Sequence, residues 1–322
     1  MKNMVKLLLS CIVMLSVTYS AWGEEIVIRV GHFPNITHAQ GVIAHQLSRQ
    51  GKGWFEERLG SEVKIEWYVY NAGPSAMEAI FANALDMTYV GPNPSINAYV
   101  KSQGEEIRII AGAANGGAAL VVQGDGSIQT PADFRGKKIA TPQLANTQDV
   151  ACRSWLKEQG YHITQLGGDV LIVPTANPDQ LSLFVDKQID GAWTVEPWVS
   201  RLELEGQGTI YLEEPDAVTT VLASSVTFLH EHRDLVQKFA HAHTELTTWI
   251  QQHPEEAQQL IQAELAAETT RSMPAELLAH AWPRLHFTNT IEIASLQKFI
   301  TAAKAVGFLR DDVDFSRLVE IP

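Results

Sequence analysis

Short β-rich runs alternate with amphipathic stretches along the first hundred residues that follow the N-terminal segment. The first run, at 26–30, is rich in β-branched residues, and a polar loop containing Pro34 separates it from a helical stretch at 39–50. The pattern continues with expected strands at 63–69 and 87–90 and expected helices at 74–84 and 94–103. Strands that alternate with helices predict an α/β fold with a largely parallel sheet.

A second series of the same kind begins near residue 130. It consists of a helical turn at 131–134, strands at 138–140, 170–173 and 191–194, and helices at 148–159 and 179–185. From residue 231 onward the pattern is nearly all helical, and the last helix, at 293–306, carries Leu296 and Ile300 on one face with Gly307 at its C-cap. The chain therefore predicts two α/β series followed by a helical C-terminal part.

The two series echo one another at an offset of 104 residues. Pro74 matches Pro178, and Asp86 matches Asp190, with Leu85 and Ile189 before the aspartates. Each aspartate precedes a short strand that leads into a proline-bearing loop. The echo favours two copies of one design, although helix, aspartate and strand also recur by chance in α/β proteins.

The first 23 residues have the features of a secretory signal peptide. Lys2 and Lys6 form a basic start, 7–17 is an apolar run too short to cross a bilayer, and Ala21-Trp22-Gly23 has small residues at the positions read by a signal peptidase. We expect cleavage after Gly23 and an exported, periplasmic chain that begins at Glu24. Acylation of Cys11 is disfavoured because this residue lies inside the apolar run.

Composition narrows the class of partner. The 322 residues, 45% of them hydrophobic, suffice for roughly two globular domains. The net charge is −13, and it becomes −15 without Lys2 and Lys6, which excludes a general affinity for nucleic acid or anionic membranes. A small anion can still be bound by local backbone amides. Cys152 would be the single cysteine left after cleavage, so no internal disulfide is expected.

Five loops follow an expected strand and open an expected helix, which is the edge where open α/β sheets bind ligands. Pro74 and Pro94 suit the first helical position, and the hydroxyls of Ser75, Ser95 and Thr147 lie near free amides that favour an oxyanion. Any one of these loops by itself is better explained as an ordinary capped helix, so the expectation rests on all five lying on one rim. The loops are 32–37, 71–75, 91–95, 141–147 and 195–198.

These loops also carry a resemblance to a known family. Five stretches carry it: GHFPNITHA at 31–39, NAGP at 71–74, GPNP at 91–94, TPQLANTQD at 141–149 and EPW at 196–198. In these stretches the chain resembles the nitrate/sulfonate/taurine family of periplasmic substrate-binding proteins. The resemblance implies an α/β, two-lobed periplasmic-binding-protein fold of type II, with two crossing strands and a ligand cleft between the lobes. On this chain it implies lobe 1 at 24–112, lobe 2 at 113–216 and completion of lobe 1 by 217–322, with crossings near 111–120 and 217–225.

The resemblance further implies a monomer that hands a small organic oxyanion to an ABC permease and its ATPase subunits. An aliphatic sulfonate is the expected ligand, with nitrate, taurine and sulfate esters left open. Glu196 is expected either to contact a donor group at the far end of the ligand or to cap backbone amides. The expected ligand-binding residues are His32, Asn35, Thr37, Gly73, Ser75, Asn93, Ser95, Asn115, Gln143, Asn146, Thr147, Trp193 and Glu196.

We expect no catalytic residue, cofactor or metal site. A spacing of two places neighbouring histidines among His230, His232, His241 and His243 on different helix faces. Cys152 suits a packing role, and Trp193 and Trp198 suit either the core or a ligand wall. Two alternatives remain: an exported sensor, or an enzyme similar to desulfinases or thiamine-pyrimidine synthases, against which the export signal argues.

Overall fold

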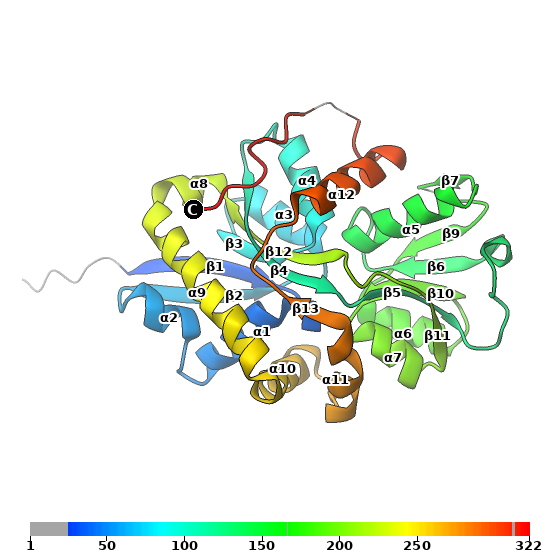
Figure 1. Cartoon of the computed structure of the whole chain (residues 1–322), viewed down its shortest axis with the longest axis horizontal. Coiled ribbons are helices and arrows are strands. Elements are labelled where there is room, and N and C mark those ends of the chain that lie inside the picture. The colour runs from blue at the N-terminus through cyan, green and yellow to red at the C-terminus, as the bar shows by residue number, and fades with distance from the viewer. Residues whose placement is uncertain (1–24, 166, 311–312) are drawn as a thin grey trace, which may run out of the picture.

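The computed structural model describes residues 25–165, 167–310 and 313–322. The expected signal peptide and its cleavage site lie outside these residues. Two sheets, each flanked by helices, form two lobes that lie side by side (Figure 1). We call the part built on the six-stranded sheet lobe 1 and the part built on the five-stranded sheet lobe 2.

The sheet of lobe 1 has the order β13-β4-β12-β3-β1-β2. Strand β1 pairs in parallel with β2 and β3, whereas β12 runs antiparallel to both β3 and β4. These strands are β1 (Ile26–His32), β2 (Val63–Val69), β3 (Met87–Val90), β4 (Ile107–Gly116), β12 (Val218–Ser225) and β13 (Leu285–Phe287).

The sheet of lobe 2 has the order β11-β5-β10-β6-β9. Strand β6 pairs in parallel with β9 and β10, and β5 runs antiparallel to β10 and β11. These strands are β5 (Ala118–Gln123), β6 (Lys138–Thr141), β9 (Leu171–Pro174), β10 (Gly191–Val195) and β11 (Gly208–Glu213), with a separate small pair β7 (Ile163–Thr164) and β8 (Gly167–Gly168).

Helices cover both faces of each sheet, as Figure 1 shows. In lobe 1, one apolar cluster lies under α1 (Ala39–Arg49), α2 (Trp54–Leu59), α9 (Arg233–Gln252), α10 (Pro254–Thr269) and α11 (Ala275–Ala281). A second cluster lies under α3 (Gly73–Phe81), α4 (Pro92–Lys101) and α12 (Ile293–Ala305). In lobe 2 the corresponding helices are α5 (Thr147–Glu158) on one side and α6 (Asn177–Val185) with α7 (Trp198–Leu204) on the other. The remaining elements are α8 (Val226–Glu231), η1 (Ile36–His38), η2 (Pro131–Phe134) and η3 (Trp282–Arg284).

The chain passes between the lobes twice. The first passage is at Gly116 and Gly117, between β4 and β5, and both glycines adopt the positive φ that glycine tolerates best. The second lies between β11 and β12. The passages are joined because the Gly116 N–H donates to the Ala217 carbonyl at 2.8 Å and the Glu214 N–H donates to the Ala118 carbonyl at 3.0 Å. The expected two-lobed fold with two crossing strands is confirmed.

The two lobes repeat one arrangement, as the sequence echo suggested. From one edge, the strand orders β2-β1-β3-β12-β4 and β9-β6-β10-β5-β11 correspond. Asp86 and Asp190 also have equivalent contacts, since each accepts a hydrogen bond of 2.8 Å from a backbone N–H of the neighbouring strand, at Arg29 and Lys138 respectively.

The expectation of a largely parallel sheet was right for one half of each sheet only. The parallel strands are β2-β1-β3 and β9-β6-β10. After each passage between the lobes, the chain enters the other sheet as β5 or β12. These two strands run opposite to the parallel strands and pair antiparallel with their neighbours. Local hydrophobic patterns do not reveal this pairing. Among the described residues, no helix combines the length and apolarity needed to cross a membrane.

Candidate ligand cleft between the lobes

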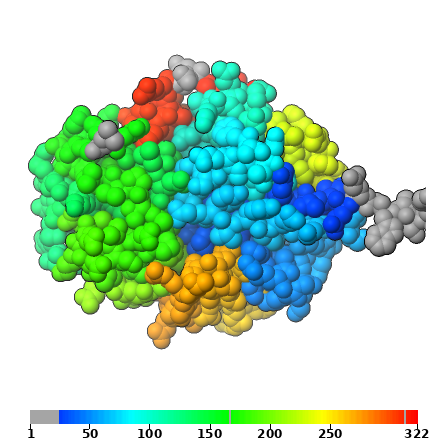
Figure 2. Space-filling view, turned by 180° about the vertical axis from the view of Figure 1, so that it is seen from behind, coloured from blue at the N-terminus to red at the C-terminus, as the bar shows by residue number. Residues whose placement is uncertain are grey.

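A small polar cavity of about 20 Å³ lies where the two lobes meet. On the face shown in Figure 2, the green residues of lobe 2 abut the cyan and blue residues of lobe 1 along a continuous seam. The cavity is lined by Phe33, Asn35, Thr37, His38, Asn71, Ala72, Gly73, Gly91, Pro94, Pro142, Asn146, Thr147, Gln148, Asn177, Val195 and Thr219. This lining draws on both lobes and includes residues from all five of the loops that the sequence singled out.

The chemistry of the lining suits an anion. None of its residues is an aspartate, glutamate, lysine or arginine, so no fixed negative charge faces the cavity from this set. Four helices of nine or more residues begin at the lining: α3, α4, α5 and α6. Backbone amides at such ends, together with the helix dipole, stabilise negative charge.

Three of these helices, α3, α4 and α6, have no capping side chain at their first turn. Helices α3 and α4 start after Ala72 and Gly91, neither of which forms a side-chain cap. Helix α5 does have a side-chain cap, because Asn146 accepts a hydrogen bond from the Asp149 N–H at 2.8 Å. The first four N–H groups of a helix have no partner within it. Proline has no N–H, which removes Pro74, Pro92 and Pro94, and the Asn93 N–H of α4 donates to Thr147. The amides left for a ligand therefore include those of Gly73 and Ser75 in α3.

Direct contacts join the lobes at the rim of the cavity. The Thr147 hydroxyl, at the start of α5, accepts from the Asn93 N–H of α4 at 3.4 Å. The Gln143 amide donates to the Ser75 hydroxyl at 3.2 Å. The Ile36 N–H also donates to the Glu196 carbonyl oxygen at 3.0 Å. The structure is therefore a closed arrangement in which the helix ends of the two lobes face each other.

His38 contributes an uncharged imidazole to this lining. It is buried, and its Nδ1 lies 3.4 Å from the Phe33 N–H, which donates to it. Burial, assisted by the neighbouring His32, holds the pKa of His38 well below its usual value. The ring is therefore neutral near pH 7 and can offer one hydrogen-bond donor without a charge.

The structure brings five of the expected ligand-binding residues into the lining: Asn35, Thr37, Gly73, Asn146 and Thr147. Three more, Ser75, Asn93 and Gln143, lie at the rim in the contacts between lobes. The Ser95 hydroxyl instead donates to the Gly91 carbonyl at 3.4 Å, and Asn115 lies within β4, paired with β12 and β13.

His32 lies elsewhere, because its side chain contacts His45 and Glu268 on the helix-covered face of lobe 1 and not the cavity. Residues at every second position of a strand share a face, so His32 lies on the same face as Ile28 and Val30, which belong to the core under α1 and α10. The alternation of Ile28, Val30 and His32 is visible in the sequence and could have placed His32 on the core face.

Glu196 caps a helix and pairs with an arginine, which fits the second of its two expected roles. Its carboxylate accepts from the Ser200 N–H at 3.1 Å and the Ser200 hydroxyl at 2.9 Å, and Arg284 donates to it at 2.9 Å. Burial raises the pKa of Glu196, and the contacts with Ser200 and Arg284 oppose that rise. The side chain is not part of the cavity lining.

The two tryptophans also have structural partners. The Trp193 indole donates to Glu214 at 2.9 Å and lines a separate groove of about 690 Å³ between α5 and α12. The Trp198 indole donates to the Asn35 side-chain oxygen at 3.1 Å, so it positions a residue of the cavity from the opposite lobe. Cys152 is buried, and burial raises the pKa of its thiol well above the usual value, which suits a packing role.

Sequence reasoning missed His38 and Asn177 as lining residues. His38 was part of the quoted motif but was not selected. Asn177 carries a clearer signal, because the offset of 104 residues that relates Pro74 to Pro178 also relates Gly73 to Asn177. The duplicated design therefore pointed to it.

Comparisons with known proteins agree with this geometry. The chain is 28% identical over 217 residues to a Bacillus subtilis (strain 168) protein whose name assigns it to aliphatic sulfonate binding, which covers 65% of this chain and 63% of that protein. It is 26% identical over 184 residues to the taurine-binding periplasmic protein of Escherichia coli (strain K12), covering 56% of this chain and 55% of that protein. The chain thus spans less than two thirds of the length of these relatives.

The fold comparison covers more of the chain. The alkanesulfonate-binding protein of Xanthomonas axonopodis pv. citri, solved with bound MOPS, superposes with a TM-score of 0.76 at 17% identity, over 93% of this chain and 99% of that chain. This likeness establishes the periplasmic-binding-protein fold. The sequence profile described as the NMT1-like family matches residues 23–266, most of both lobes, and the chain belongs to that family.

Proposed function

We propose that this chain is a periplasmic solute-binding protein that carries a small organic oxyanion, an aliphatic sulfonate, to an ABC permease and its ATPase subunits. The observation that carries the proposal is the cavity between the lobes, where α3, α4, α5 and α6 begin and the lining has no charged carboxylate or cationic side chain. The names of the relatives and the shared fold support the same class of ligand.

The lining favours a sulfonate that lacks an amino group. A taurine ammonium group would need an acceptor of negative charge, and Glu196, the candidate for that role, is engaged by Ser200 and Arg284. Burying an unpaired ammonium group is costly. An alkyl tail requires no such partner and can lie against Phe33, Pro94 and Val195.

Ligand entry requires the lobes to part, because a cavity of about 20 Å³ accommodates little more than one water molecule. We infer that residues 25–116 with 217–322 move as one body and 117–216 as the other. The first boundary differs from the expected one at 112, because β4 continues to Gly116 in the sheet of lobe 1. The paired passages at Gly116–Gly117 and Glu214–Ala217 serve as the hinge.

Calorimetry with ethanesulfonate and taurine, two molecules of similar size, tests the ligand class. We expect ethanesulfonate to bind at least tenfold more tightly, and tighter binding of taurine would contradict the proposal. Thr147→Val retains the shape and removes the hydroxyl, so it should weaken binding by about 1 to 3 kcal/mol. Thr248→Val is the matched control, because Thr248 is exposed on α9 and its hydroxyl only donates to the Thr244 carbonyl.

A further inference from the structure

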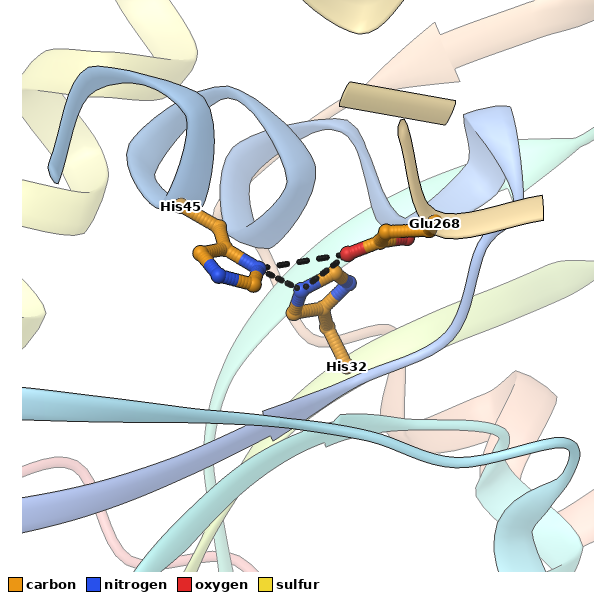
Figure 3. A group of neighbouring side chains, drawn as sticks. All are labelled: His32, His45 and Glu268. Carbon is orange, nitrogen blue, oxygen red and sulfur yellow. Dashed lines mark hydrogen bonds and ion pairs between the residues drawn. The ribbon is translucent and has the colours of Figure 1, made fainter. Parts of the chain in front are cut away.

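A buried cluster of two histidines and two glutamates lies in lobe 1, outside the lining of the cleft. His32 ends β1, His45 lies on α1 and Glu268 lies on α10 (Figure 3). Glu264 lies one turn before Glu268 on the same helix. The side chains of His32 and Glu264 have no exposed area, and those of Glu268 and His45 are 2% and 11% exposed. The fold thus encloses four side chains that come from distant parts of the sequence.

Three donor atoms of this cluster form a nearly equilateral triangle. His32 Nε2 lies 2.9 Å from His45 Nδ1, and Glu268 Oε1 lies 3.1 Å from the first and 3.2 Å from the second. In a tetrahedral zinc site with bonds of about 2.0 to 2.2 Å, neighbouring ligand atoms are about 3.3 to 3.6 Å apart. Shifts of a few tenths of an ångström would therefore let these atoms hold one ion.

Hydrogen bonds alone leave this cluster poorly satisfied. His45 Nδ1 carries at most one hydrogen, yet it lies within 3.2 Å of three polar atoms, because Glu264 Oε1 is also only 2.9 Å away. Glu264 Oε2 and Glu268 Oε2 are buried and have no hydrogen-bond partner among the described residues. These two carboxylates lie four positions apart on α10, where like charges repel.

Arg49 reaches the cluster but does not compensate the charge of both carboxylates. Arg49 donates to Glu264 Oε1 at 2.9 Å, but its own side chain is half exposed, and its ion pair among the described residues is with Glu264 and not with Glu268. A buried pair of carboxylates needs either a shared proton or a compensating positive charge. A dication between the two histidines and the two glutamates would supply that charge.

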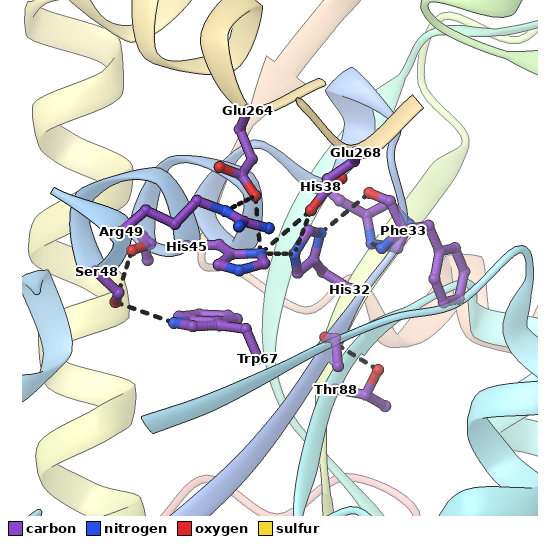
Figure 4. A network of polar contacts seen from close by, with 12 residues as sticks. His32, Phe33, His38, His45, Ser48, Arg49, Trp67, Thr88, Glu264 and Glu268 are labelled. Atoms are coloured by element: carbon purple, nitrogen blue, oxygen red, sulfur yellow. Dashed lines mark hydrogen bonds and ion pairs between the residues drawn. The ribbon is translucent and has the colours of Figure 1, made fainter. Parts of the chain in front are cut away.

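Neighbouring groups fix the orientation of the His32 and His45 rings (Figure 4). Rings of metal-binding histidines are oriented in the same way, by groups around them. His32 Nδ1 faces the Phe33 carbonyl oxygen at 3.3 Å, which leaves Nε2 free to bind an ion. Trp67 stacks on His45 with ring centroids 5.5 Å apart and meets His32 edge-on. The Trp67 indole N–H in turn donates to the Ser48 hydroxyl at 3.0 Å. This bond fixes the tryptophan ring against which both histidines pack.

We propose that this cluster binds one divalent transition-metal ion of the zinc class, with His32 Nε2, His45 Nδ1, Glu268 and Glu264 as its ligands. Two imidazoles and two carboxylates form a four-coordinate set suited to such an ion. The bound ion joins α10 to β1 and α1, beside the loop that leads from His32 to the cleft residues Asn35 and Thr37. Its role is structural and does not depend on the anion that the cleft binds.

Metal analysis of the intact chain, exchanged into zinc-containing buffer and then freed of loose metal by gel filtration, tests the site directly. We expect about one zinc per chain, a melting temperature lowered by several degrees after treatment with a strong chelator, and recovery when zinc is restored. X-ray absorption of the zinc-loaded chain should show two imidazole ligands. A zinc content far below one, or a spectrum with fewer than two imidazoles, would overturn the proposal.

Variants locate the site. His45→Gln and Glu268→Gln should each weaken zinc binding at least tenfold, whereas His241→Gln should leave it unchanged, because His241 is 77% exposed and pairs only with Glu245. Equal zinc affinity in all three variants would refute the assignment. If a cluster variant does not fold, metal content and X-ray absorption of the unaltered chain still decide. Sulfonate calorimetry on the same sample separates this outcome from failure of the proposed anion site.

Discussion

Replacing Gly91 with alanine should obstruct closure of the lobes while leaving each lobe intact. A Cβ at this position would lie 2.4 Å from Thr147 Oγ1, which belongs to the opposite lobe, whereas within lobe 1 it would approach the Thr219 carbonyl oxygen at an ordinary 3.7 Å. Gly91 has φ of −67° and ψ of 154°, a conformation that alanine adopts readily. The clash therefore acts across the cleft.

The size of the effect follows from this geometry. Overpacking by one methyl group in a closely fitted contact costs about 1 to 3 kcal/mol. If that cost falls on the closed, ligand-bound arrangement, Gly91→Ala should weaken sulfonate binding roughly 5- to 150-fold. Stability of the free protein should stay equal or rise slightly, since alanine lowers the entropy of the unfolded chain.

A double-mutant cycle with Thr147→Ala separates this clash from other causes. Thr147→Ala removes the hydroxyl that meets the new methyl group, so the double variant should bind no more weakly than Thr147→Ala alone. Calorimetry gives the four affinities, and thermal melting gives the four stabilities. If Gly91→Ala binds as tightly as the unaltered chain, or if the two losses simply add, closure does not bring α4 and α5 together as described.

Two further predictions concern buried ionisable groups. Burial lowers the pKa of His243 to about 4, so between pH 6.5 and 4 the unfolded chain binds more protons and stability should fall with acidification, by roughly 3 kcal/mol in total. Urea unfolding should show a flatter pH dependence for His243→Gln than for the exposed control His241→Gln, and identical slopes would contradict this. Arg284→Met leaves the buried Glu196 without its ion-pair partner and should cost about 3 kcal/mol, whereas Arg317→Met removes an exposed pair and should leave stability nearly unchanged. Equal losses in urea unfolding would show that the Glu196 contact is not buried as described.

The fold was largely predictable because its elements are short, regular and amphipathic. The strand expected at 63–69 matches β2, and the helix expected at 148–159 begins one residue from α5. The antiparallel half of each sheet was not predictable in this way, since it arises where the chain passes from one lobe into the sheet of the other. The register of the strands and the passage of the chain between lobes depend on tertiary pairing. The local alternation of apolar and polar residues does not encode that pairing.

For the cleft, backbone features were predicted better than side-chain directions. Gly73, Asn146 and Thr147 follow from the position of helix starts after strands. Glu196 was expected near the ligand because it lies on the loop 195–198, and Trp193 because it lies just before that loop, but their side chains turn to Ser200 and Glu214. The histidine–glutamate cluster was out of reach, because His45 and Glu268 lie 223 positions apart and meet only when α1 packs on α10.

A crystal structure with bound ethanesulfonate would show where the anion binds. We predict electron density for the sulfonate in the cavity between the lobes, with its oxygens at about 2.9 Å from backbone N–H groups in the first turns of α3 or α5. We also predict the alkyl tail against Phe33, Pro94 or Val195. Density in the groove between α5 and α12 beside Glu214, with the cavity unchanged, would contradict this prediction.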